Sequence, residues 1–276
     1  MSKSKKNVQG GQSLKESLQS AFASGAILVA LIVAILIYKF IMGNPANFQG
    51  GNPAGSPLPG NFLAMIYKGG FIVPILITCV LCVLIFSIER WVMLRRARGT
   101  GRINQFVKNI QTKLAANQID EAVTACDQQK GSVANVMKAG LKKYKELKDD
   151  NVLEKEQKVL ALQKEMEEST ALELPMLNKN LVILSTLASI SVLIGLIGTV
   201  LGMIRAFAAL ASAGSPDALA LATGISEALI NTAFGITGSC LAIVFYNFFS
   251  SKIDNLTFKI DESGFSLIQT FASTTK

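Results

Sequence analysis

The chain has 276 residues, of which 50% are hydrophobic and only 17% are charged, against about 25% in an average soluble domain. Its 27 Lys and Arg residues outnumber the 19 Asp and Glu residues, and it contains no histidine. The lack of histidine excludes a Ser-His-Asp triad, an HExxH zinc site and a histidine proton relay. Because the apolar residues gather in long runs, the composition predicts an integral membrane protein rather than a soluble domain.

Four stretches are long and apolar enough to cross a membrane, since a spanning helix needs roughly 20 apolar residues. They cover residues 23–42, 71–94, 181–210 and 219–249. The backbone in hydrocarbon must pair its own polar groups, so we expect an all-α integral membrane protein whose later helices extend into a cytoplasmic helical bundle. The first stretch follows basic residues, as a signal peptide would. However, its apolar run continues to Met42 without a small-residue cleavage site, which favours an uncleaved span.

Lysine and arginine residues indicate the side of the membrane that each loop occupies. Segment 89–180 holds 17 of them and the first 22 residues hold four, whereas segment 43–70 holds only Lys68. Both termini and the large loop are therefore expected in the cytoplasm. The expected order is a cytoplasmic segment 1–22, an extra transmembrane helix 23–42, a periplasmic Gly/Pro-rich loop 43–70, a transmembrane helix 71–94, a cytoplasmic helical region 95–180, a transmembrane helix 181–210, a periplasmic loop 211–218, a transmembrane helix 219–249 and a cytoplasmic C-terminal helix 250–276.

The two larger loops have different patterns. Within the expected loop 43–70, residues 43–60 are rich in Gly, Pro and Asn, which is typical of a flexible link, with a binding loop as the alternative. In the region 95–180, apolar residues recur at three- and four-residue steps from Ile103 to Leu114, which predicts a helix. A second helix is expected to begin with Asp120 as its N-cap, and a charged stretch near 152–173 favours a long solvated helix.

One carboxyl group lies deep within the fourth predicted span. An ionisable side chain there is costly, so Glu227 is a functional candidate. Apolar surroundings favour the protonated form of a carboxyl group, and a group that is neutral there but charged near water can carry a proton. Thr223 and Asn231 lie four residues before and after it, on the same helix face, and are candidates to support it. The alternative is a structural glutamate that is hydrogen-bonded within a helix bundle.

Two polar residues stand out in the third span. Arg205 lies near its outer end, where it could either extend to water or pair with an acidic group. Thr199 could line a narrow wet path or bond a carbonyl of its own helix, and for an isolated threonine the second is favoured. Small residues on the last two spans predict close helix packing, and these are Gly195, Gly198, Gly202, Gly224 and Gly235.

Motifs in the last two spans resemble those of the MotA/TolQ/ExbB proton-channel family. Residues 195–200 read GLIGTV and resemble the family's GLLGTV core, and residues 224–236 are similar to its GIxEALxxTAxGL segment. Residues 246–249 read YNFF and resemble its YNxF end. The resemblance covers most of residues 70–253 and is nearest to the ExbB branch. Ser191-Val192 stands where the family usually has Ala-Pro, and the first span is extra to the common three-span ExbB plan.

The resemblance implies a homo-oligomer, expected to be a pentamer, in the bacterial inner membrane. It implies a proton pathway through Glu227, Thr199 and Thr232, around an ExbD- or TolR-like single-span subunit. The carried ion would be H⁺, with Na⁺ as the alternative, and no cofactor, metal or nucleic acid is expected.

The implied function is an ExbB-like motor that couples proton motive force, through a TonB-like protein, to outer-membrane transport. The alternatives are a TolQ-like envelope-integrity motor, a MotA-like stator and a non-conducting membrane scaffold. An enzyme is not expected, because no nucleophile–base arrangement or nucleotide motif occurs.

Overall fold

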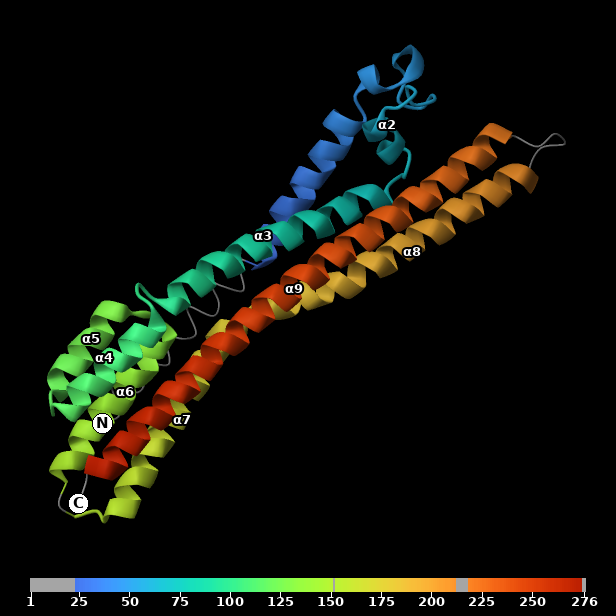
Figure 1. Cartoon of the computed structure of the whole chain (residues 1–276). Coiled ribbons are helices and arrows are strands. Elements are labelled where there is room, and N and C mark those ends of the chain that lie inside the picture. The colour runs from blue at the N-terminus through green and yellow to red at the C-terminus, as the bar shows by residue number, and fades with distance from the viewer. Residues whose placement is uncertain (1–22, 151, 212–217, 275–276) are drawn as a thin grey trace, which may run out of the picture. The chain divides into compact units, whose positions relative to one another are not determined.

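The structure is a computed structural model that describes residues 23–150, 152–211 and 218–274 (Figure 1). The expected segment 1–22 and residues 212–217 of the expected loop 211–218 lie outside them. Four helical stretches are long and apolar enough to cross a membrane, which confirms the predicted all-α fold. They are Ala23–Met42, Ile72–Ala115, Lys155–Ala211 and Ala218–Thr274.

The helical elements follow one another along the chain. Residues 23–36 are helical and continue as the π-helical turn η1 (Ile37–Met42). The later elements are η2 (Pro45–Asn47), η3 (Gln49–Gly51), α2 (Phe62–Tyr67), α3 (Ile72–Arg98), α4 (Ile103–Ala115), α5 (Ile119–Gln129), α6 (Gly131–Asp149), α7 (Lys155–Asn178), α8 (Leu181–Ala211) and α9 (Ala218–Thr274). The predicted span 219–249 and C-terminal helix 250–276 are thus parts of one continuous helix as far as Thr274.

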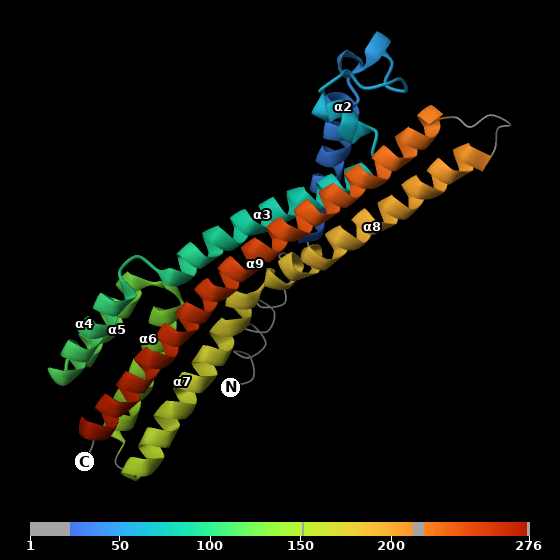
Figure 2. The same ribbon diagram turned by 45° about the vertical axis from the view of Figure 1, so that its right-hand side comes forward.

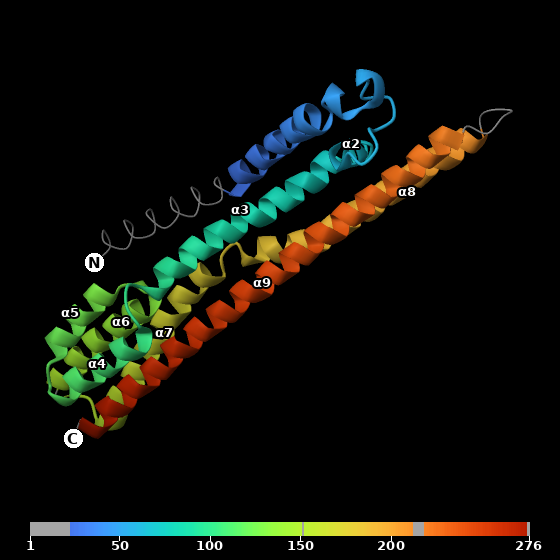
Figure 3. The ribbon, with the colours of Figure 1, turned by 45° about the horizontal axis from the view of Figure 1, so that its top comes forward.

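The chain divides into two compact units, and the first contains residues up to Ser87 together with Ile183–Phe245. In this unit the N-terminal helix packs on the first half of α3 (Figure 3). Buried Ala34 contributes to a cluster with Val73 and Ile77. The Tyr38 ring stacks on the Tyr67 ring with centroids 4.6 Å apart, and the Tyr38 hydroxyl donates to the Tyr67 carbonyl at 3.0 Å. The extra span is therefore an integral part of this unit.

Residues 43–60, whose composition suggested a flexible link, form short helices and hydrogen-bonded turns and lead into α2. Its asparagines supply hydrogen bonds that fix turns: Asn44 caps η2 and Asn61 caps α2 through their side-chain oxygens. The Asn47 amide donates to the Ile41 carbonyl at 2.8 Å. Phe48 is only 2% exposed and packs edge-on against Tyr67. Turn-forming residues and one buried aromatic thus organise a segment that lacks a conventional core.

Helices α8 and α9 run side by side through the first unit (Figures 1 and 2). Their backbones come unusually close, because small residues face each other at the contact. A Cβ atom built on Gly195 would lie 3.0 Å from the Gly235 Cα, and one on Gly202 would lie 2.8 Å from the Ala228 nitrogen. Larger side chains at these positions would force the two helices apart.

The second unit contains Ile88–Val182 and Tyr246–Lys276. Helix α6 packs on α5 and α7, and α5 packs on α4. Helix α9 joins this bundle through the Gln111–Ser266 and Tyr144–Thr274 hydrogen bonds, at 2.6 and 2.8 Å. Helix α5 begins at Ile119 after an N-cap at Gln118, so the predicted N-cap Asp120 lies in the first turn. There its carboxylate is still close to the positive end of the helix dipole.

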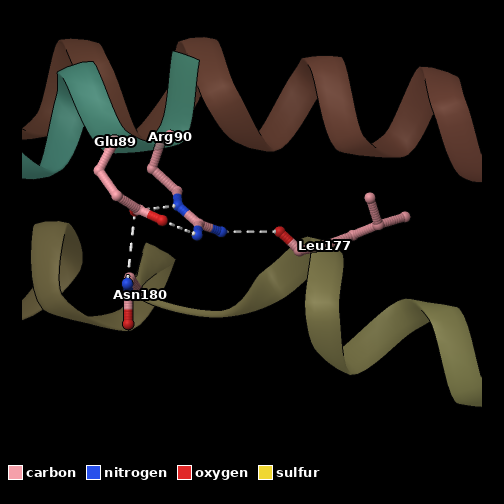
Figure 4. Close-up of polar contacts among 4 residues, drawn as sticks. All are labelled: Glu89, Arg90, Leu177 and Asn180. Atoms are coloured by element: carbon pink, nitrogen blue, oxygen red, sulfur yellow. Dashed lines mark hydrogen bonds and ion pairs between the residues drawn. The ribbon is translucent and has the colours of Figure 1, made fainter. Parts of the chain in front are cut away.

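A buried arginine fixes the corner between α7 and α8 within the second unit (Figure 4). Arg90 is 1% exposed and donates to both carboxylate oxygens of Glu89, at 2.7 and 2.6 Å. It also donates to the Leu177 carbonyl at 3.2 Å, and the Asn180 amide donates to Glu89 at 3.3 Å. These bonds satisfy a charged pair that would otherwise be costly to bury.

Candidate functional site

Glu227 lies on the face of α9 that is turned towards α8. Its side chain is 7% exposed, and Oε1 accepts a hydrogen bond and ion pair from Arg205 Nη1 at 2.5 Å. The Arg205 side chain is 51% exposed, and its guanidinium also lies 5.7 Å from the centre of the Phe71 ring. Of the two alternatives for Arg205, pairing with an acid is therefore the one observed.

A turn before α3 covers the carboxyl group of Glu227. Gly70 has φ of +75°, a conformation that favours glycine. A Cβ atom added to Gly70 would contact Glu227 Oε1 and would lie 3.5 Å from Arg205 Nη1. The backbone of this turn therefore occupies the space beside the ion pair, and only a residue without a side chain fits there.

Asn231 fixes the same turn from one helical turn further along α9. The Asn231 side chain is completely buried, and its amide donates to the Gly69 carbonyl at 2.9 Å. Its Oδ1 atom has no hydrogen-bond partner among the described residues. The buried amide thus holds the Gly69-Gly70 turn and still presents an acceptor close to Glu227.

Two threonine hydroxyls form a second polar contact between α8 and α9. Thr199 and Thr232 are hydrogen-bonded to each other through their hydroxyl groups. Thr199 is also within 3.1 Å of the Gly195 carbonyl, and Thr232 within 3.2 Å of the Ala228 carbonyl. Thr199 therefore bonds its own helix, as expected for an isolated threonine, and contacts Thr232 as well. Glu227 and Thr232 therefore both contact α8, Glu227 at Arg205 and Thr232 at Thr199.

The remaining predicted residues take up simpler positions. Thr223 is exposed and donates to the Leu219 carbonyl of its own helix at 2.8 Å, and within the described chain it is not hydrogen-bonded to Glu227. The five glycines named from the sequence all lie at close approaches between α8 and α9. A Cβ atom on Gly198 would meet Asn231 Cβ at 2.5 Å, and one on Gly224 would meet the Ala206 nitrogen at 2.8 Å.

Two contributors to the site escape sequence reasoning. Gly69 and Gly70 precede the second span, and nothing in their local pattern connects them with a carboxyl group more than 150 residues away. The one available signal is the glycine pair itself, which marks a place where the backbone turns or closely approaches another group.

This arrangement can couple protonation to movement. The ionised carboxylate attracts the guanidinium, whereas a protonated carboxyl group would lose that charge–charge attraction. Because the arginine is half exposed, the pair contributes at most about 1 kcal/mol. A proton that reaches Glu227 could therefore release Arg205 at little cost. Across the described residues, no group of His, Cys, Asp and Glu side chains could hold a metal ion.

Fold and site together define a multi-pass membrane protein in which two close-packed helices enclose one ion-paired carboxyl group. Residues 128–262 match the MotA/TolQ/ExbB proton channel family. That match includes Thr199, Arg205, Glu227, Asn231 and Thr232. Over these residues the chain is similar to this family, whose members are proton channels of the bacterial inner membrane rather than enzymes.

The chain is similar to relatives from two branches of the family. It is 27% identical to the Tol-Pal system protein TolQ of Haemophilus influenzae, over 70% of this chain and 86% of that protein. It is 25% identical to TolQ of Pseudomonas aeruginosa, over 62% of this chain and 76% of that protein. The biopolymer transport protein ExbB of Salmonella typhimurium is 39% identical, but over only 25% of this chain and 29% of that protein. The TolQ similarity is thus lower in identity but far longer.

Proposed function

We propose that this chain is the proton-conducting subunit of an inner-membrane motor of the TolQ type. The buried, ion-paired Glu227 carries the proposal, because its carboxyl group is enclosed by two packed spans and paired with Arg205, beside hydroxyl and amide groups. The length of the TolQ similarity favours this branch over the ExbB branch that the sequence motifs suggested. The ExbB branch is supported by the higher identity of its shorter match, so it is the second candidate.

In the proposed cycle Glu227 accepts a proton from one side of the membrane and loses it to the other. Protonation weakens the pair with Arg205, and deprotonation restores it. One charge that crosses 100 mV supplies about 2.3 kcal/mol, which is more than the pair itself contributes. Thr199, Thr232 and Asn231 would orient water near the carboxyl group, since each offers a hydrogen-bonding atom at the contact between α8 and α9.

The proposed assembly is a homo-oligomer, with a pentamer expected, around a single-span partner of the TolR or ExbD kind. Both termini and residues 95–180 would lie in the cytoplasm, in line with the distribution of Lys and Arg. The proposed ion is H⁺, because a buried carboxyl group can carry a proton without a ligand cage. Copurification with the partner and a mass-resolved subunit ratio would test the assembly.

The test of function replaces Glu227 with Gln, Ala and Asp in cells that lack the native protein. We expect Glu227→Gln and Glu227→Ala to lose motor activity at normal protein levels, with partial activity for Glu227→Asp, which keeps the carboxyl group. Detergent sensitivity of the envelope reports a TolQ role, and uptake of an iron chelate through the TonB system reports an ExbB role. Normal results for Glu227→Gln and Glu227→Ala in both assays would favour a non-conducting scaffold.

A further inference from the structure

The second unit has an open groove lined by the end of α3 and by α9. Its volume is about 590 Å³, within the range of small-molecule sites. Four cationic residues from both helices contribute to its lining, and no acidic residue does. They are Arg95, Arg98, Lys252 and Lys259.

Two exposed aromatic rings form the wall of this groove. Trp91 of α3 stacks on Phe248 of α9, with centroids 6.2 Å apart and planes 10° apart. Each ring carries a cation one helical turn further on: Arg95 lies 5.4 Å from the Trp91 ring and Lys252 lies 5.6 Å from the Phe248 ring. Trp91 is 48% exposed and Phe248 is 42% exposed, so the apolar wall is open to its surroundings.

The positive charge of the groove is largely uncompensated. Within the part of the chain that the structure describes, Arg95, Arg98 and Lys252 form no ion pair, whereas Lys259 pairs with Glu262 at 2.7 Å. The arginines at the end of α3 complement the helix dipole. That reason does not extend to Lys252, which lies far from either end of α9. Its position beside Arg95 therefore needs another explanation.

We propose that this groove binds the head group of an anionic phospholipid. Arg95, Arg98 and Lys252 would contact the phosphate, and the Trp91–Phe248 wall would contact the glycerol and upper acyl chain. The groove lies where the apolar part of α3 ends and its arginines begin, which is the depth at which tryptophan and basic residues meet lipid head groups. The exposed apolar rings favour a lipid over soluble phosphate, because a free phosphate ion has no apolar part that could pack against them.

Trp91 is the single tryptophan of the chain, so its fluorescence reports on this groove alone. The purified full chain would be reconstituted into vesicles of phosphatidylcholine with a minor fraction of phosphatidylglycerol. In one set the phosphatidylglycerol is brominated, and in the other an equal amount of the phosphatidylcholine is brominated. Lipid composition is then constant and only the position of the quencher differs. We expect stronger quenching by brominated phosphatidylglycerol.

The double variant Arg95→Gln/Lys252→Gln should lower this preference by about fivefold for each of the two basic residues that it removes, the effect expected near a charged surface. Lys155→Gln/Lys164→Gln removes two exposed cations of α7 and should leave the preference unchanged. Equal quenching in the wild-type chain, or equal losses in the two double variants, would overturn the proposal. So would a preference that inorganic phosphate abolishes but chloride of the same ionic strength does not, since the site would then take soluble phosphate.

Discussion

The side-chain amide of Asn231 donates to the carbonyl of Gly69 at 2.9 Å, across 162 residues of sequence. This bond joins the N-terminal part of α9 to the turn that precedes α3. The next residue in the turn, Gly70, lies against the carboxyl group of Glu227. One buried hydrogen bond therefore positions the backbone that covers the candidate proton carrier and its ion pair with Arg205.

Asn231→Leu should destabilise the chain by about 1–3 kcal/mol, because it leaves the Gly69 carbonyl without its buried donor. Reversible unfolding in detergent would measure the loss. Thr223→Ala is the matched control on the same helix, since its exposed hydroxyl bonds only to Leu219 of its own helix. We expect that control to change stability by no more than about 0.5 kcal/mol. Equal effects of the two variants would mean that the Asn231–Gly69 bond contributes nothing specific.

Gly70→Ala should reduce motor activity more than a glycine-to-alanine change of similar backbone cost elsewhere in the chain. Its new Cβ atom would have to displace the Glu227 carboxyl group, in addition to straining a backbone with φ of +75°. Gly60→Ala is a close control, because Gly60 has φ of +80° and nothing lies within 4 Å of the added atom. Backbone strain should lower the stability of both variants by a similar amount, about 1 kcal/mol. Equal activity of the two would show that the cover over Glu227 has no functional role.

Arg205→Gln should lower activity by about fivefold, corresponding to loss of a half-exposed ion pair. Because Glu227→Gln is itself expected to abolish activity, the coupling between the two residues is measured on stability. Arg205→Gln should lower the free energy of unfolding in the wild-type background but not in a Glu227→Gln background, where the carboxylate that Arg205 contacts is already gone. The free energies of unfolding of the four proteins in detergent form a double-mutant cycle. Additive losses would contradict the proposal that Arg205 acts through Glu227.

Arg90→Met should destabilise the second unit by about 3 kcal/mol, because it leaves the Glu89 carboxylate and the Leu177 carbonyl without their donor. Thermal unfolding monitored by helix content would measure this loss. Arg96→Met provides the control, since Arg96 is exposed and lies six residues further along the same helix. A similar small shift in both variants would show that the Glu89–Arg90 contact is not what fixes the α7–α8 corner.

Residues 43–60 show how composition can mislead. Its asparagines and prolines are typical of flexible links, yet the same residue types cap helices and fix turns when acceptors lie nearby. Composition records which groups are present, but not whether a partner is within hydrogen-bonding distance. The predicted N-cap, Asp120, lies two residues after the observed N-cap, Gln118. Several polar residues near the start of a helix can occupy the cap, and the local sequence does not decide between them.

The sequence by itself determined the four spans, the helical loop region, the small residues of α8 and α9, and Glu227 as the carboxyl group to examine. Hydrocarbon imposes these features locally: a span must be apolar for about 20 residues, and a charge within it stands out. Only the tertiary structure decided that Arg205 pairs with Glu227, that Thr199 bonds Thr232, and that Gly69 and Gly70 complete the site. Those contacts join segments 22 to 162 residues apart, and they depend on how the helices pack rather than on any local period.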